Sequence, residues 1–182
     1  REITVFARTR ADMDASSRPT LHPAEHMYLA PETAGIYKVL EDIPAEAAVL
    51  INAVISNGIR WVRVMGGVTI GDKVVIQGVG QQGLAAIIAA REAGAAKVIV
   101  TGLSKDQERF KLAREFGVDH IVNVEEEGVV KRVAELTAGK LADVVIDVTG
   151  NPEALKITPD LVRSQGTIVS SGVTGTDTIT PS

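Results

Sequence analysis

The sequence predicts an α/β fold, with a doubly wound parallel sheet that carries helices on both faces. From residue 71 onward, short apolar runs alternate with helix-like segments, and the turns between them are short and polar. Parallel strands need crossover connections that lie on the faces of the sheet, so this alternation is typical of a parallel sheet. A glycine-rich turn joins the first apolar run directly to the first helix. In such folds, ligands bind at the carboxyl edge of the strands.

Residues 1–40 do not follow this alternation. They contain two apolar runs, at 3–7 and 26–29, which are candidate strands separated by a polar stretch. We interpret this segment as the remnant of a separate N-terminal domain.

Residues 41–70 are predicted to connect that remnant to the sheet. Apolar residues occupy most faces of the segment 45–64, Pro44 can begin a helix there, and Gly66-Gly67 can end it. We therefore expect a long, mostly buried helix, followed by a ligand-binding domain over 71–182 that is incomplete at its C-terminal end.

The first strand and helix of that domain flank a G-x-G-x-x-G turn. The apolar run 74–76 follows a Gly71-Asp72 turn, as expected of a strand buried on both faces. The glycine turn occupies 78–83, and the alanine-rich stretch 84–93 has strong helix propensity and ends at Gly94. The strand before the turn and the helix after it make the motif a specific indication of dinucleotide binding.

Each glycine of the turn has its own expected role. Gly78 permits a tight turn, Gly80 lets the backbone approach a pyrophosphate, and Gly83 lets the helix pack closely on the strand. The free N–H groups of the helix N-terminus and its dipole favour an anion there. The residues predicted to hold the pyrophosphate are Gly78, Val79, Gly80, Gln81, Gln82 and Gly83.

The remaining elements alternate in the same way. Strands are expected at 97–101, 120–122, 143–148 and 167–171, and helices at 105–116, from 129 to Gly139, and after Asn151-Pro152. Ser104 is predicted to cap the first of these helices, together with Gln107, and Asn151 the last. The acidic run 125–127 suits the N-terminus of the middle helix. Pro159 should divide the last helix into two pieces.

The end of the second strand is the expected site of the adenosine ribose. An acidic residue there usually binds the ribose hydroxyls of NAD, and here the position is Gly102. Ser104 and Lys105 could hydrogen-bond and neutralise a 2′-phosphate, which favours NADP over NAD. The alternative is that Ser104 only caps the helix and Lys105 is only a solvated side chain.

The loops after the fourth and fifth strands should line the same crevice. Thr149 and Gly150 follow the fourth strand, and Ser171 closes the fifth. We expect these three residues toward the nicotinamide end of a bound cofactor. Asp147 is expected to be a structural hydrogen-bond acceptor. The sequence does not identify catalytic residues.

From about Ala24 to its end, the chain resembles the medium-chain, zinc-type alcohol dehydrogenase family. The resemblance rests on the residues 24–29, the long helix before Gly71-Asp72, the turn 78–83 and the stretch 143–152. It implies a nicotinamide-dependent oxidoreductase that acts on an alcohol or carbonyl as a homodimer or homotetramer, with NADP or NAD as cofactor. It also implies that residues 1–40 derive from a catalytic domain, most of which is missing from this chain.

The chain departs from that family at the zinc site. Members bind zinc in the catalytic domain with a ligand from the long helix, where this chain has Ile51-Asn52-Ala53-Val54. None of these is a usual zinc ligand. No metal ligands are therefore assigned in this chain, although the complete enzyme could use zinc.

Composition excludes several other functions. The net charge of −4 and pI near 5.4 provide no basic surface for nucleic acid. No apolar run is long enough to span a membrane, no leader is evident and there is no cysteine, so we expect a cytoplasmic protein that acts on a small molecule.

Three rival interpretations remain. His22-Pro23-Ala24-Glu25-His26 matches H-x-x-E-H, but a proline inside the motif disfavours the helix that a zinc peptidase needs. A non-catalytic dinucleotide-sensing module would explain the missing catalytic residues. A methyltransferase also uses a glycine turn, although it usually has an acidic residue where this chain has Gly102.

Overall fold

The computed structural model describes residues 39–172, so the candidate strands at 3–7 and 26–29 and the histidines of H-x-x-E-H lie outside the described residues. The chain divides into two compact units, residues 1–51 and 52–182. Within the first unit, the described residues form the short helix α1 (Ala45–Leu50), which begins after Pro44 as expected. The sheet and the candidate site lie in the second unit.

A helical segment leads into the sheet, as predicted. It comprises η2 (Ile51–Ile55), α2 (Ser56–Ile59) and η3 (Arg60–Met65), of which the first and last are π-helical. The prediction that the helix is mostly buried was wrong. Only one row, Val54, Gly58 and Val62, is buried, because positions four apart share the face that packs on the sheet unit. Several large apolar residues on its other faces are exposed, namely Ile51, Ile59, Val64 and Met65.

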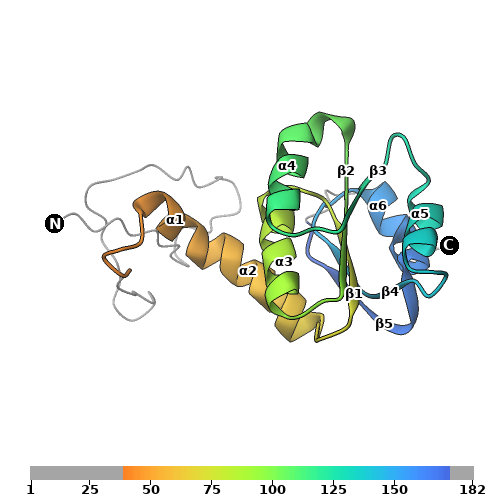
Figure 1. Cartoon of the computed structure of the whole chain (residues 1–182), viewed down its shortest axis with the longest axis horizontal. Helices are drawn as coiled ribbons and strands as arrows, with labels where there is room; N and C mark the ends of the chain where they lie inside the picture. The colour runs from red at the N-terminus through yellow and green to blue at the C-terminus, as the bar shows by residue number, and fades with distance from the viewer. Residues whose placement is uncertain (1–38, 173–182) are drawn as a thin grey trace, which may run out of the picture. The chain divides into compact units, whose positions relative to one another are not determined.

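The five strands form one parallel sheet in the order β3-β2-β1-β4-β5 (Figure 1), which confirms the predicted doubly wound architecture. The strands are β1 (Lys73–Gln77), β2 (Lys97–Gly102), β3 (His120–Asn123), β4 (Ala142–Asp147) and β5 (Val162–Ser170). The order reverses direction at β1, between β2 and β4. This is the topological switch point at which ligands bind in doubly wound sheets.

The fifth strand is longer than predicted. It begins at Val162 rather than at 167, and its pairing with β4 shifts register between Ala142 and Val144. Gln165 has a φ of +61° in this irregular stretch. The sequence pattern therefore identified only the regular, second half of the strand.

Helices connect the strands. They are α3 (Gln81–Glu92), η4 (Ser104–Asp106), α4 (Gln107–Glu115), α5 (Val129–Leu136), α6 (Pro152–Ile157) and η5 (Thr158–Leu161). The predicted division at Pro159 is confirmed, because α6 ends just before it and a 3-10 turn follows. The predicted cap is also confirmed, since the Asn151 side chain accepts a hydrogen bond of 2.8 Å from the N–H of Glu153. The acidic run 125–127 is not in the first turn of α5, which begins at Val129 after Gly128.

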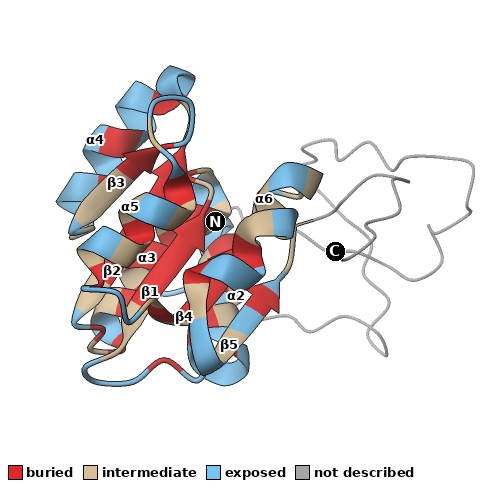
Figure 2. Ribbon diagram, turned by 90° about the vertical axis from the view of Figure 1, so that its right-hand side faces the viewer, coloured by how far each residue is buried: buried red, intermediate tan, exposed pale blue. Residues whose placement is uncertain are grey.

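Two apolar clusters bury the two faces of the sheet. On one face, Val74 and Ile76 of β1 pack with residues of α3 and with Phe110 of α4. On the other face, Val75 packs with α5 and with Leu161 of η5. Figure 2 shows the buried strands between partly exposed helices. Successive residues of β1 thus point to opposite layers, as in a strand covered on both sides.

Two carboxylates join neighbouring strands outside the apolar layers. Asp143 of β4 accepts hydrogen bonds from the Lys73 N–H at 2.8 Å and from Arg163 Nε at 2.6 Å. Asp119, just before β3, accepts from the Val98 N–H at 2.7 Å and pairs with Arg91 at 2.5 Å. Partial burial alone would raise the pKa of each carboxyl group, but these hydrogen bonds outweigh it and lower the pKa of both.

Candidate dinucleotide site

The glycine turn between β1 and α3 has the geometry that its spacing predicts. Gly78 has a φ of +102°, a left-handed conformation that side chains rarely permit. A Cβ atom on Gly83 would lie 2.0 Å from the carbonyl oxygen of Gly78, which no side chain could tolerate. These two glycines therefore hold the start of α3 against the end of β1.

Gly80 differs from the other two glycines of the turn. Its φ is −67°, so it is not required for backbone conformation, and a Cβ atom built on it meets nothing within 4 Å. It is the N-cap of α3, and no side chain caps the helix. Among the described residues, the N–H groups of Gln81, Gln82 and Gly83 have no hydrogen-bond partner, as is usual at a helix start. The turn thus combines open space with free backbone donors.

The side chains that flank the glycines of the turn differ in burial. Val79 is buried in the core and packs under the turn. Gln81 is exposed, whereas Gln82 is half-buried and donates from Nε2 to the Ala53 carbonyl at 3.3 Å. The backbone N–H groups of Gln81 and Gln82 are the donors at this helix start that could serve a phosphate.

The loops after β4 and β5 meet the glycine turn. The Thr149 methyl group lies 3.0 Å from where a Cβ on Gly78 would be. Gly172 approaches so closely that a Cβ on it would lie 2.1 Å from the Gly150 nitrogen, and the Ser171 N–H donates to the Asp147 carbonyl at 2.9 Å. The predicted residues Thr149, Gly150 and Ser171 are therefore gathered at one edge, beside Gly78.

Asp147 supports this edge from within the sheet. It is fully buried, and its Oδ1 accepts from the N–H of Thr149 at 3.2 Å and from the Thr149 hydroxyl at 2.6 Å. These bonds fit the structural role expected of it. Its Oδ2 has no partner among the described residues and lies 3.1 Å from a Cβ built on Gly172.

The end of β2 is shaped by packing. Gly102 is buried, and a Cβ on it would lie 2.6 Å from Phe110 and 3.0 Å from Val79. An acidic side chain at this position would collide with the core. The packing of Phe110 and Val79 therefore leaves no room for a side chain at residue 102.

The predicted capping role of Ser104 was wrong. The side chain that accepts from the start of this helical turn is Asp106, whose Oδ2 receives the Leu103 N–H at 3.1 Å. Ser104 is engaged elsewhere, because its hydroxyl accepts from Asn123 Nδ2 at 2.8 Å. Its N–H donates to the Glu125 carboxylate at 2.7 Å. Ser104 thus joins the loop after β2 to the loop after β3.

Glu125 is the residue of this edge that the sequence pattern missed. Lys105 is exposed, and its charge acts on the Glu125 carboxylate. The hydrogen bond from the Ser104 N–H is the largest influence, and it lowers the pKa of Glu125. Only its place in the run 125–127 distinguished it in the sequence, and that run suggested a helix terminus instead.

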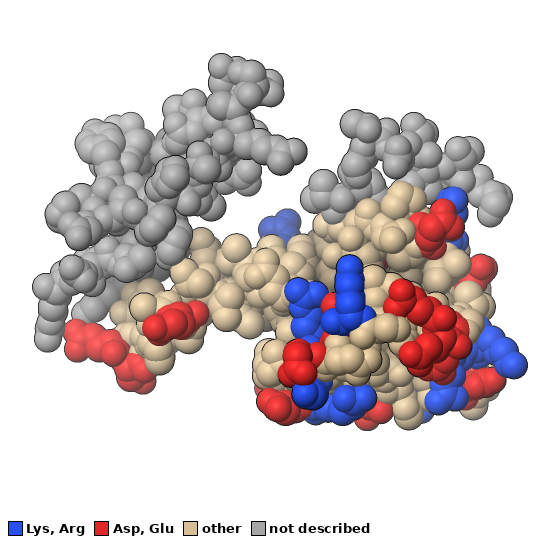
Figure 3. All heavy atoms as spheres, turned by 90° about the horizontal axis from the view of Figure 1, so that it is seen from above, with Lys and Arg blue, Asp and Glu red and all other residues tan. Residues whose placement is uncertain are grey.

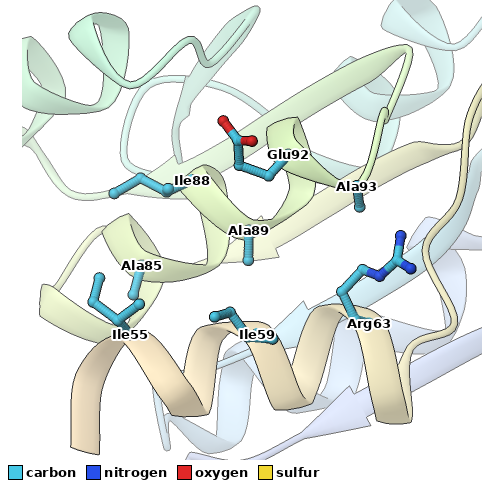
Figure 4. A pocket seen from close by; sticks show the side chains of 8 residues that line it. All are labelled: Ile55, Ile59, Arg63, Ala85, Ile88, Ala89, Glu92 and Ala93. Carbon is cyan, nitrogen blue, oxygen red and sulfur yellow. The ribbon is translucent and has the colours of Figure 1, made fainter. Parts of the chain in front are cut away.

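A separate hollow of about 370 Å³ lies between α3 and the helical segment of η2, α2 and η3 (Figure 4). Its lining is mostly apolar and comes from the helical segment and α3, namely Ile55, Ile59, Arg63, Ala85, Ile88, Ala89, Glu92 and Ala93. The glycine turn does not contribute to it. A Cβ on nearby Gly58 would lie 2.8 Å from the backbone of Ala85, so the two helices cross closely at one end of this hollow.

Figure 3 shows basic and acidic side chains interspersed on the face in view. Residues 39–172 contain no group of three His, Asp or Glu side chains that could hold a metal ion. No helix within the same residues is long and apolar enough to cross a membrane.

Comparison with known proteins gives a consistent result. The family described as zinc-binding dehydrogenases matches residues 83–182. A Mycobacterium tuberculosis protein named as a probable alcohol dehydrogenase is 43% identical over 159 residues, which are 84% of this chain and 41% of that protein.

Solved structures show the same similarity. Benzyl alcohol dehydrogenase from Acinetobacter calcoaceticus has a TM-score of 0.73 at 28% identity, covering 80% of this chain and 39% of its own. A zinc-binding dehydrogenase from Sinorhizobium meliloti 1021, bound to NADP, has a TM-score of 0.64 at 29% identity, covering 69% and 37%. The chain spans about two fifths of the length of these proteins.

Proposed function

Because this chain belongs to the zinc-binding dehydrogenase family, we propose that it is the dinucleotide-binding part of an oxidoreductase that transfers hydride between NAD(P) and an alcohol or carbonyl compound. The observation that carries the proposal is the turn at Gly78–Gly83, where close packing at Gly83 accompanies open space at Gly80. Open space alone is not specific, because Gly128 at the start of α5 shares it; what distinguishes this turn is the close packing at Gly83 beside the open space. Family membership favours this enzyme over a sensing module.

The residues present fit such a cofactor. The free N–H groups after Gly80 would hold the pyrophosphate, because the start of α3 offers donors and a positive dipole end without a capping side chain. Thr149, Gly150 and Ser171 would line the nicotinamide half, and Gly102, Ser104 and Lys105 the adenosine half. The bound nicotinamide supplies the hydride chemistry, while these residues bind and orient it.

The substrate pocket, any zinc site and the oligomeric assembly would be formed by the complete enzyme. We propose that residues 1–40 derive from its catalytic domain, that 41–70 form the connection and that 71–182 form the cofactor domain. Resemblance to the family also supports a homodimer or homotetramer, which light scattering of the purified protein would test. The composition favours a cytoplasmic location, which cell fractionation would test. No zinc-dependent step is assigned to residues 39–172, whose side chains do not form a metal site.

The choice between the two cofactors depends on opposing features. Lys105 and the absence of an acidic side chain at Gly102 support the prediction of NADP, and the S. meliloti protein is a relative with NADP bound. The Glu125 carboxylate beside Ser104 opposes a 2′-phosphate. Calorimetric titration of the chain with NADPH and with NADH measures the preference directly.

Replacement of Gly80 tests the site itself. Gly80→Ala should weaken binding of both NADH and NADPH at least tenfold, because the methyl group would project into the open space of the turn. Gly128→Ala is the matched control, since Gly128 is the N-cap of α5, has a φ of −71° and also has nothing within 4 Å of a built Cβ. Both variants lose a favourable N-cap, so a similar small loss of stability is expected. Equal binding by the two variants would reject the site.

A further inference from the structure

The loop after β3 is tied to the loop after β2 by a chain of hydrogen bonds. The Val124 N–H donates to the Gly102 carbonyl at 3.0 Å, and Asn123 Nδ2 donates to the Ser104 hydroxyl at 2.8 Å. Asn123 Oδ1 in turn accepts from the Glu125 N–H at 3.2 Å. These contacts fix the backbone of Glu125 beside the end of β2. Its carboxylate then accepts from the Ser104 N–H at 2.7 Å.

The end of the second strand is where a doubly wound sheet usually binds the adenosine ribose of a dinucleotide. A carboxylate at the end of the second strand binds the ribose hydroxyls of NAD and repels the 2′-phosphate of NADP. Residue 102 cannot supply it, because Phe110 would lie 2.6 Å from its Cβ. The next strand along the edge, β3, supplies a carboxylate to the same neighbourhood instead.

The charged side chains that act on Glu125 beside Ser104 are those of Lys105 and Asp106. Lys105 lies close enough to lower the pKa of Glu125, and Asp106 on the same turn opposes it. Asp106 itself is paired with Arg109 at 2.8 Å. Two cations therefore face two carboxylates here. Neutralising Glu125 leaves one uncompensated positive charge, which favours an incoming phosphate.

We propose that Glu125 discriminates against the 2′-phosphate of NADP, and so takes the role that an acidic residue at the end of β2 usually has. This inference rests on the proposed function. Glu125 acts through its negative charge, which the hydrogen bond from the Ser104 N–H holds beside the end of β2 and which would repel the 2′-phosphate.

The test compares cofactor preference in three proteins: the unaltered chain, Glu125→Gln and Glu126→Gln. The amide oxygen of glutamine can still accept from the Ser104 N–H, so the loop is expected to keep its structure. Glu126→Gln removes the same charge one residue away, where the side chain is exposed and makes no hydrogen bond or ion pair with the described residues. Dissociation constants for NADH and NADPH are measured by calorimetry for each protein, after circular dichroism has confirmed that it is folded.

In Glu125→Gln, the ratio of the NADPH to the NADH dissociation constant should fall at least tenfold, which corresponds to about 1.4 kcal/mol. In Glu126→Gln the ratio should stay within twofold of the unaltered chain. A ratio unchanged in Glu125→Gln, with both cofactors bound, would overturn the inference while leaving the proposed function intact. An equal shift in both variants would also overturn it, because it would show only a long-range effect of net charge. If the unaltered chain binds neither cofactor, the proposed function fails and the inference with it.

Discussion

At the scale of single residues, three glycines of one motif differ in what they do. Gly78 supplies a left-handed conformation, Gly83 a close approach, and Gly80 an unfilled space. The motif predicted a separate role for each glycine, and the geometry at Gly78 and Gly83 agrees with it. The structure separates two residues whose replacement should damage folding from one whose replacement should damage binding.

Gly83→Ala is therefore expected to destabilise the fold. The new Cβ would meet the Gly78 carbonyl oxygen at 2.0 Å, so α3 must move away from β1. Overpacking of this kind typically costs about 1–3 kcal/mol of unfolding free energy, measured here by urea denaturation. Gln81→Ala, an exposed position in the same first turn, should change stability far less. A stable Gly83→Ala protein would mean that the helix does not pack as closely as described.

At the scale of secondary-structure elements, local signals predicted local features. Asn151 caps α6 and Pro159 ends it, because both effects depend on residues next to one another in the chain. Ser104 had an equally good local signal, yet its hydroxyl and its N–H are engaged by Asn123 and Glu125 of another loop. Such contacts depend on which strands become neighbours. The adenosine end of the candidate site was therefore predicted only in part.

Asp143 links β1, β4 and β5, so we expect its protonation to affect the stability of the fold. Hydrogen bonds from Lys73 and Arg163 lower the folded-state pKa of Asp143 below that of the unfolded chain, which is about 3.9. Its contribution to stability is thus fully present above the unfolded pKa and is lost as the pH falls through the folded pKa. Asp143→Asn should lower the unfolding free energy at pH 7 by about 1–3 kcal/mol and reduce the loss of stability on acidification.

Asp160→Asn serves as the control for that experiment. Asp160 is exposed and makes no hydrogen bond or ion pair with the rest of the described chain, so its replacement should leave the pH dependence unchanged. Urea denaturation between pH 7 and pH 3 gives both curves. If the two variants lose stability in parallel with the unaltered chain, Asp143 does not provide the proposed link.

At the scale of the whole second unit, the sheet order was predictable and the exposed surface was not. Alternating apolar runs and right-handed crossovers leave few arrangements for five parallel strands. By contrast, apolar residues on every side of the helical segment suggested burial, and only the row of Val54, Gly58 and Val62 is covered. The sequence shows that a helix is apolar, whereas the elements that pack against it determine which face is buried.

The proposed site spans the ends of four strands, so dinucleotide binding should stabilise the unit as a whole. The predicted contacts lie after β2, β1, β4 and β5, which are consecutive in the sheet. A ligand that binds only the folded state adds about 2.7 kcal/mol when its free concentration is one hundred times its dissociation constant. Urea denaturation with and without the better-bound cofactor should show this increment for the unaltered chain. Hydrogen exchange should slow together at the loops 78–83, 102–105 and 149–150, because one ligand would contact all three. Slowing at only one of these loops would mean that the cofactor occupies part of the edge, and the assignment of the other residues would then be wrong.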